Sequence, residues 1–147
     1  MFKRILVATD DSDLSRKAVK GAIELAAATR TTLVALHVVP RYPMSYFEGS
    51  VVLGPDEVAR IEKQWSDKGH ALVDAVRLQA QEAGVDAKAI IAQGDGVADA
   101  IIAAAGKNHC ELIVMASHGR RGIGRVLLGS ETQHVLTHST IPVLVLR

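Results

Sequence analysis

Near its C-terminal end the chain carries a run of residues suited to binding a phosphate group. The apolar stretch from Leu112 to Met115 is followed by closely spaced glycines, and a helical pattern begins near Ser130. Glycine lets the main chain approach a ligand, and the first turn of a helix offers unpaired N–H donors at the positive end of its dipole. This order of elements favours an anion site; the alternative is a flexible surface turn. The glycines are Gly119, Gly122, Gly124 and Gly129.

The glycine spacing separates this loop from the two commoner phosphate-binding signatures. The chain has no GxxxxGK[ST] sequence, and no GxGxxG follows its first apolar run. This argues against a P-loop nucleotide triphosphatase and against a dinucleotide-dependent dehydrogenase. His118 and three arginines within the loop could contact a phosphate, or they could be ordinary loop residues. The arginines are Arg120, Arg121 and Arg125.

The other reactive side chains have structural interpretations beside their chemical ones. Ser130 and Gln133 form a capping-box pattern, so this serine could cap its own helix, contact a phosphate, or do both. His134 and His138 lie one helical turn apart, a spacing that can hold a metal, but no third ligand follows. Cys110 precedes a buried strand and is predicted to be a small core residue. No Ser-His-Asp arrangement or catalytic carboxylate pair is evident, so no catalytic residue is predicted.

The elements that position these residues alternate between strand and helix along the chain. A first helix is predicted to begin after Ser12, which can cap it, and three more over residues 55–83, 97–105 and 130–138. Gly69 weakens the second helix by roughly 1 kcal/mol relative to alanine and could bend it. Residues 40–54 form a loop that could fold over a nearby site or be a simple insertion. Strands are predicted over residues 2–9, 31–39, 87–93, 111–116 and 142–146.

This alternation predicts a single α/β domain over residues 1–147, with one parallel sheet of about five strands between layers of helices. A hydrophobic share of 48% with only 3% aromatic residues predicts an aliphatic core, which suits parallel strands covered on both faces. In such sheets the ligand lies beyond the carboxyl ends of the strands, where the strand order reverses.

The net charge and the number of cysteines indicate which partners and which cellular compartment to expect. The formal net charge of +1 provides no overall attraction to nucleic acid or to an anionic membrane. A single cysteine cannot form an internal disulfide and fits a reducing compartment. There is no signal-peptide profile, and no apolar run approaches the roughly 18 residues that span a bilayer. We expect a cytoplasmic protein without a nucleic-acid or membrane partner.

Several stretches together resemble the universal stress proteins, in particular the branch of that family that binds ATP. They are KRILVATD with Ser12, LHVV at residues 36–39, ELIVMASHGRRG and the terminal IPVLVLR. The branch carries a glycine, two residues, a second glycine, nine residues, and then glycine with serine or threonine. In this chain Gly119, Gly129 and Ser130 match the later part of that motif.

Two positions depart from the family pattern. Ala116 stands where the motif has its first glycine. If that position needs a left-handed φ, the methyl group costs about 1–2 kcal/mol, whereas alanine obstructs little if only close approach is needed. Asp11 stands where the family often has glycine. A second carboxylate beside Asp10 could repel a triphosphate or help to hold Mg²⁺.

The resemblance implies a fold, a ligand and a set of contacts. The fold is Rossmann-like (adenine nucleotide alpha hydrolase-like), with strand order 3-2-1-4-5 and helices on both faces. The ligand is ATP, with Mg²⁺: the residue matching Asp10 lies near the ribose or adenine, the backbone at Val38 contacts the base, and the glycine loop holds the phosphates. Carried onto this chain, the contacts are Ala8, Thr9, Asp10, Val38, Gly119, Gly129 and Ser130. Further candidates in and beside the loop are Ala116, His118, Arg120 and Gly122.

The resemblance also implies a homodimer and a regulatory role. The terminal strand, Pro142 to Leu146, is apolar on both faces and is expected at the sheet edge, where an unpaired strand invites pairing. Family members dimerise through this strand. We expect a nucleotide-responsive stress protein with at most slow ATP hydrolysis, because the sequence offers no obvious base to activate water. The alternative is a dimeric interaction module of the same fold that binds no nucleotide.

Overall fold

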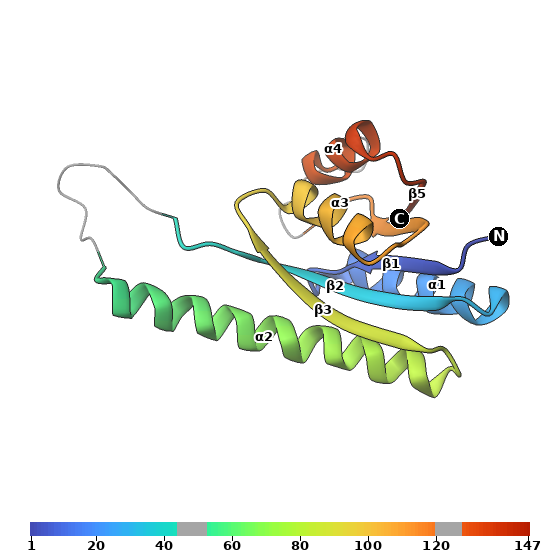
Figure 1. Cartoon of the computed structure of the whole chain (residues 1–147), viewed down its shortest axis with the longest axis horizontal. Helices are drawn as coiled ribbons and strands as arrows, with labels where there is room; N and C mark the ends of the chain where they lie inside the picture. Colours follow the sequence, from blue (N-terminus) through green and yellow to red (C-terminus); the bar gives the residue numbers. More distant parts are fainter. Residues whose placement is uncertain (44–52, 120–127) are drawn as a thin grey trace.

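A parallel sheet in the order β3-β2-β1-β4-β5 forms the centre of the fold (Figure 1). The computed structural model describes residues 1–43, 53–119 and 128–147. The strands are β1 (Arg4–Ala8), β2 (Thr32–Pro40), β3 (Ala87–Gly94), β4 (Leu112–Ala116) and β5 (Val143–Leu146). The helices are α1 (Asp13–Thr29), α2 (Pro55–Glu82), α3 (Val97–Lys107) and α4 (Ser130–His138). The predicted α/β fold and its strand order are confirmed.

The strand order reverses beside β1, which is the central strand. β1 pairs in parallel with β2 as far as Ala8↔Leu36 and with β4 as far as Val7↔Val114. The chain therefore leaves β1 towards β2 and β3, and later returns to β4 on the other side of β1. The described residues that directly follow β1 and β4 lie at this point, which is where open α/β sheets bind their ligands.

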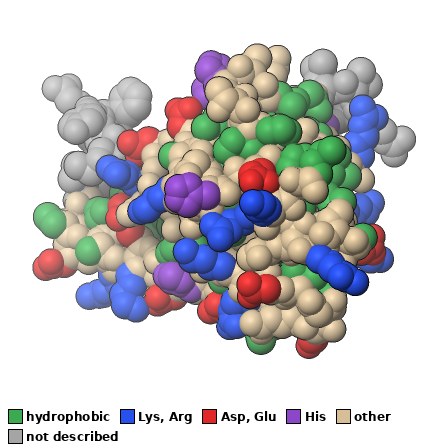
Figure 2. All heavy atoms as spheres, turned by 45° about the vertical axis from the view of Figure 1, so that its right-hand side comes forward, with side chains coloured by type: hydrophobic (Ala, Val, Ile, Leu, Met, Phe, Trp, Pro, Cys, Tyr) green, Lys and Arg blue, Asp and Glu red, His purple; other side chains and the backbone are tan. Residues whose placement is uncertain are grey.

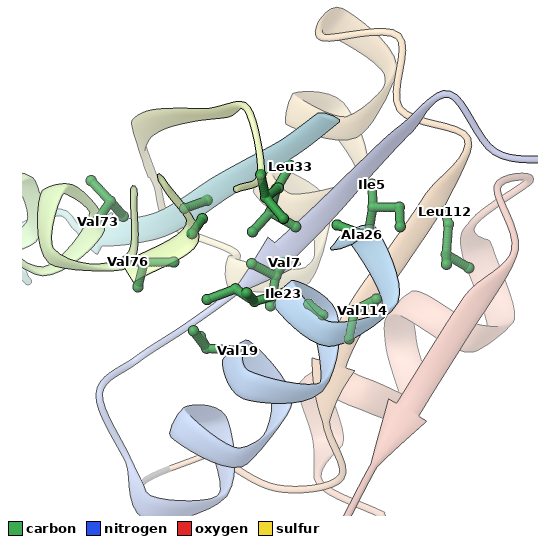
Figure 3. Packing of buried hydrophobic residues seen from close by; sticks show 14 residues of the cluster. Ile5, Val7, Val19, Ile23, Ala26, Leu33, Val73, Val76, Leu112 and Val114 are labelled. Carbon is green, nitrogen blue, oxygen red and sulfur yellow. The ribbon is translucent and has the colours of Figure 1, made fainter. Parts of the chain in front are cut away.

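Helices cover both faces of the sheet, and aliphatic side chains fill the two interfaces. α1 and α2 cover one face, where Val19 and Ile23 of α1 and Val73 and Val76 of α2 belong to one cluster with strand residues such as Val7 (Figure 3). α3 and α4 cover the other face, which buries a second cluster that includes Leu6, Leu36, Ile101, Ile113 and Val135. Burying one such side chain contributes about 1.5–3 kcal/mol, so these two clusters hold the helices against the sheet.

Local signals explain where the helices begin and end. Ser12 caps α1 by accepting a hydrogen bond from the Ser15 N–H at 3.3 Å, as predicted. α2 starts at Pro55 and is followed by Gly84, whose φ of 77° suits glycine. α2 is one helix through Gly69, so this glycine needs an explanation other than a break in the helix.

The surface carries both signs of charge. Figure 2 shows Lys and Arg side chains interspersed with Asp and Glu over one face of the molecule, in agreement with the net charge of +1.

Within the described ranges, none of the helices is both long enough and apolar enough to cross a lipid bilayer. The predicted loop at 40–54 falls mostly on residues 44–52, which lie outside the described residues.

Candidate functional site

Asp10 and Gly119 lie against each other at the point where the strand order reverses. Asp10 follows β1 and Gly119 follows β4, so the parallel pairing of these strands brings the two residues together. A Cβ atom placed on Gly119 would lie 2.7 Å from the Asp10 Oδ2 atom, closer than real Cβ contacts come. A residue with a Cβ atom at position 119 would displace this carboxylate, so the glycine permits the present close approach.

Gly129 closes the glycine-rich loop beside Gly119. Its N–H donates to the Ser117 carbonyl oxygen at 2.8 Å. A Cβ atom on Gly129 would lie 3.2 Å from that oxygen and 3.3 Å from the His118 Cα atom, both of which belong to the backbone. The start of α4 is therefore held next to the end of β4. Arg120 and Gly122, two of the predicted contacts, lie outside the described residues.

Of the roles that the sequence left open for Ser130, capping of α4 does not hold. The N-cap residue is Gly129, and no side chain makes a capping hydrogen bond there. Ser130 is the first helical residue, and its side chain is exposed. The serine falls one position too late to cap because the glycine that approaches Ser117 takes the N-cap position. Its hydroxyl is consequently not committed to capping α4.

The Asp10 carboxylate is oriented by its own loop. Its Oδ1 atom accepts the Ser12 N–H at 2.9 Å, while the other oxygen faces Gly119. The neighbouring Asp11 has φ of 65°, a left-handed conformation in which glycine is favoured. The Asp11 Oδ1 atom accepts the Arg16 Nε–H at 3.1 Å, and this hydrogen bond is the main cause of the raised pKa of the Arg16 guanidinium. The charge of the Asp11 carboxylate is therefore balanced by the Arg16 guanidinium.

Thr9 is anchored on three sides. Its N–H donates to the Leu36 carbonyl oxygen at 2.9 Å, its buried hydroxyl lies 3.0 Å from the Ser15 hydroxyl, and its carbonyl oxygen lies 2.8 Å from the His37 Nδ1 atom. The preceding residue, Ala8, ends β1. His37 is absent from the predicted site residues. The sequence does contain a hint that His37 has a specific role, because it is the only strongly polar side chain within the apolar run TLVALHVVP.

The backbone of Val38 faces the space beyond the end of β1. The Thr32 N–H and the Leu36 carbonyl oxygen both form hydrogen bonds on the side of the strand that faces β1. The Leu33 N–H forms its hydrogen bond on the opposite side, towards β3. Since alternate residues of a parallel strand direct their polar groups to the same neighbour, Val38 directs its N–H and carbonyl towards β1. β1 pairing has already ended at Ala8. The side chain of Val38 is buried in the core, with 8% of it exposed.

Ala116 does not incur the conformational cost that its departure from glycine suggested. It is the last residue of β4, is buried, and is not among the described residues that have positive φ. Its carbonyl oxygen accepts the Thr132 hydroxyl at 2.9 Å, which ties α4 to the end of β4. The adjacent His118 is half-buried, and its Nδ1 atom lies 3.0 Å from the Ser117 hydroxyl.

A hollow of about 550 Å³ lies on the same edge of the sheet, at the ends of β2 and β3. Pro40, Tyr42, Val58 and Glu62 are among its lining residues. The Glu62 carboxylate is held in place by the Tyr42 N–H and the Gln93 side-chain amide, each at 3.1 Å. There is therefore open space close to the carboxyl end of β2, two residues beyond Val38.

The remaining candidates have structural partners. The His134 Nε2 atom lies 2.9 Å from an Asp99 oxygen, and its ring stacks on His138 with centroids 4.1 Å apart. Among the described residues no three His, Cys, Asp or Glu side chains form a group that could hold a metal. Cys110 is a buried core residue, as predicted, and burial raises the pKa of its thiol to about 11.

Comparison with known proteins is consistent with this geometry. The model of the Universal stress protein family matches residues 1–147. The chain is 34% identical over 149 residues to Universal stress protein YxiE of Bacillus subtilis, covering 100% of both chains. It is similar in structure to universal stress protein UspA from Lactobacillus plantarum, with a TM-score of 0.78, 26% identity and coverage of 99% of this chain and 97% of that one.

A further solved structure adds a ligand. It is a universal stress protein crystallised in complex with cAMP, and it matches this chain with a TM-score of 0.72 and 26% sequence identity. The match covers 99% of this chain and 97% of the other. An adenine nucleotide is thus bound by a protein of similar fold and related sequence.

Proposed function

Because the chain belongs to the universal stress protein family, we propose that it binds ATP at the carboxyl ends of β1 and β4, beside Asp10 and Gly119. The observation that carries the proposal is the close approach of Gly119 to Asp10, with Gly129 packed on the backbone of Ser117 and His118. A Cβ atom at Gly119 would collide with the Asp10 carboxylate, and one at Gly129 would press on the backbone of Ser117 and His118. The related structure with bound cAMP supports an adenine nucleotide as the ligand class.

Each part of the nucleotide has a matching group. The N–H groups at the start of α4 suit the phosphates, because they lie at the positive end of the helix dipole. The amide of Gly129 itself is excluded, since it donates to Ser117. The Asp10 carboxylate can accept hydrogen bonds from ribose hydroxyls, and the Val38 main chain can bond the base. Mg²⁺ prefers oxygen ligands, and the exposed Ser130 hydroxyl provides one beside the phosphates.

The chain provides little that would accelerate hydrolysis. A general base must lie within hydrogen-bonding reach of the attacking water, and the described carboxylates near the site already have roles. Asp10 is held by the Ser12 N–H, and Asp11 is paired with Arg16. We therefore propose a nucleotide-responsive stress or regulatory protein with at most slow ATP turnover, acting in the cytoplasm.

The same proposal includes a homodimer formed through β5. This strand lies at the sheet edge next to β4, and Leu144 within it is 38% exposed. An apolar edge strand exposes unpaired backbone groups that can pair with another chain. Antiparallel pairing of two β5 strands about a two-fold axis would satisfy these groups and bury Leu144.

Two measurements test nucleotide binding directly. Purified protein is denatured and the supernatant is assayed for adenine nucleotides, and unfolding is measured with and without Mg-ATP. At a ligand concentration one hundred times Kd, the free energy of unfolding should increase by about 2.7 kcal/mol. Absence of released nucleotide, together with no stabilisation at millimolar Mg-ATP, would favour the alternative, a dimeric interaction module that binds no nucleotide.

A matched pair of glycine variants locates the site. Gly129 and Gly54 are both N-cap residues with similar extended backbones, but a Cβ on Gly54 meets nothing within 4 Å. Gly129→Val should abolish the stabilisation by Mg-ATP in a protein that still folds, because the side chain displaces the backbone of Ser117 and His118. Gly54→Val should retain it. Equal stabilisation of both variants would mean that the nucleotide binds elsewhere.

A further inference from the structure

His37 occupies a position between the candidate nucleotide loop and the long helix α2. On one side its Nδ1 atom lies 2.8 Å from the carbonyl oxygen of Thr9. On the other side its Cδ2 atom faces Gly69 of α2, where a Cβ atom would lie only 2.8 Å away. The imidazole ring therefore fills the space between α2 and the residue that precedes Asp10.

The hydrogen bond fixes both the ring and the peptide that it contacts. A carbonyl oxygen can only accept, so the Nδ1 atom of His37 must carry the hydrogen. The Thr9 N–H and hydroxyl are already held by Leu36 and Ser15. With its carbonyl held as well, the peptide plane between Thr9 and Asp10 has a single orientation.

That orientation determines where the Asp10 carboxylate points. Asp10 shares the peptide whose carbonyl His37 holds, and its side chain reaches both the Ser12 N–H and the backbone of Gly119. Rotation of this peptide would move the carboxylate away from Gly119. A residue that contacts no nucleotide can therefore control the geometry of the site through one carbonyl group.

Gly69 makes this arrangement possible. It is buried in the middle of α2, where glycine is a poorer helix former than alanine. Besides approaching His37, a Cβ there would lie 3.2 Å from the Val39 Cγ2 atom. The ring cannot retreat from α2 without being pushed against the Thr9 carbonyl oxygen, which is already 2.8 Å away. The glycine thus provides the room that the imidazole needs.

We propose that His37 is a positioning residue for the Thr9–Asp10 peptide, and that Gly69 of α2 provides the space for its ring. This rests on the proposed function in so far as the peptide belongs to the nucleotide site. The role of His37 is to orient Asp10 through the Thr9 carbonyl, and α2 influences the site through the same contact.

Substitutions at His37 separate the hydrogen bond from simple packing. His37→Leu fills the space without a donor, whereas His37→Asn places an amide N–H near the position of Nδ1. Since one net hydrogen bond contributes about 0.5–1.5 kcal/mol, His37→Leu should weaken Mg-ATP binding by about twofold to twelvefold in titration calorimetry. His37→Asn should recover most of that loss. Equal weakening in both variants would overturn the positioning role in favour of packing.

A second readout does not depend on nucleotide. In the nucleotide-free protein, NMR should show His37 protonated at Nδ1, and the amide resonance of Asp10 should shift in His37→Leu and return in His37→Asn. An Asp10 resonance that is unchanged in His37→Leu overturns the inference. If the wild type binds no Mg-ATP, the proposed function fails, and the Asp10 resonance still decides whether His37 orients the peptide.

Two glycine-to-alanine variants test the contribution of α2. Gly69→Ala should shift the Asp10 resonance and weaken Mg-ATP binding as His37→Leu does, although alanine favours the helix. Gly106→Ala is the control, because it lies in α3 and its Cβ would meet nothing within 4 Å. It should leave both measurements unchanged. A wild-type Asp10 resonance in Gly69→Ala would show that α2 does not constrain the ring.

Discussion

Asp11 has a left-handed backbone conformation and also forms an ion pair. The first lowers the stability of the folded state, and the second raises it. Its φ of 65° disfavours residues that carry a Cβ atom, while its carboxylate pairs with Arg16 on the exposed start of α1. Exposed ion pairs contribute little to stability. A single substitution at this position therefore mixes a backbone effect with an electrostatic one, and two variants are needed to separate them.

We predict that Asp11→Gly is more stable than Asp11→Ala by about 1 kcal/mol, because both lose the Arg16 pair and only alanine retains the strained Cβ. Chemical denaturation of the two variants measures the difference. Identical midpoints and slopes would show that the left-handed conformation is not retained in solution.

Cys110 should be an unreactive thiol. Burial raises its pKa from 9.0 to about 11, so at pH 8 about one thiol in a thousand is ionised instead of about one in ten. We predict alkylation at least a hundredfold slower in the folded protein than in the unfolded chain, measured with iodoacetamide at pH 8. Equal rates would contradict burial of this side chain.

The same pKa shift predicts how stability depends on pH. The folded state holds the thiol proton more tightly than the unfolded chain does. The free energy of unfolding should therefore be independent of this group below pH 9 and should fall as the pH rises from 9 to 11. Unfolding curves over this range test the prediction, with Cys110→Ala as the control that removes this component of the slope.

At the scale of elements, α4 provides the cap that α3 lacks. The N-cap of α3 is Gly96, which has no side chain to accept the first N–H groups. The Glu131 carboxylate of α4 accepts the Ala98 N–H at 2.8 Å instead, and Asp99 of α3 pairs with His134 of α4. The first turn of α4 belongs to the candidate phosphate site, and these contacts with α3, on the same face of the sheet, hold α4 in place.

We predict that Glu131→Ala lowers the free energy of unfolding by about 1 kcal/mol, since loss of a helix cap costs this much. Glu131→Gln should lose less, because its amide oxygen still accepts the hydrogen bond. Denaturant unfolding measures both, and Glu24→Ala, at an exposed position within α1, is the control. A loss no larger in Glu131→Ala than in the control would show that α3 is not capped by α4.

At the scale of the whole molecule, the sheet is covered on its faces but not at its β5 edge. We predict that Leu144→Lys weakens the proposed dimer, because an added charge on an edge strand opposes pairing. Leu78→Lys, on α2 and 53% exposed in the wild type, is the control. Sedimentation should give dimers for the wild type and Leu78→Lys and monomers for Leu144→Lys. A monomeric wild type would contradict the dimer itself.

The sequence by itself determined the elements and the place of the candidate site. The bounds predicted for α4 are those observed, and the other elements agree within a few residues. Helix and strand periods depend on residues a few positions apart, so they are visible in a single chain. The closely spaced glycines and Asp10 could likewise be assigned to the carboxyl ends of neighbouring strands, because alternating strands and helices form parallel sheets.

Only the tertiary structure decided which partners these residues have. The contact of His37 with Thr9 and Gly69, the capping of α3 by Glu131, and the failure of Ser130 to cap α4 all depend on strand order and helix packing. Such contacts join residues that lie far apart along the chain. Local propensity describes each partner separately, whereas the distance between the two partners exists only once the core has packed.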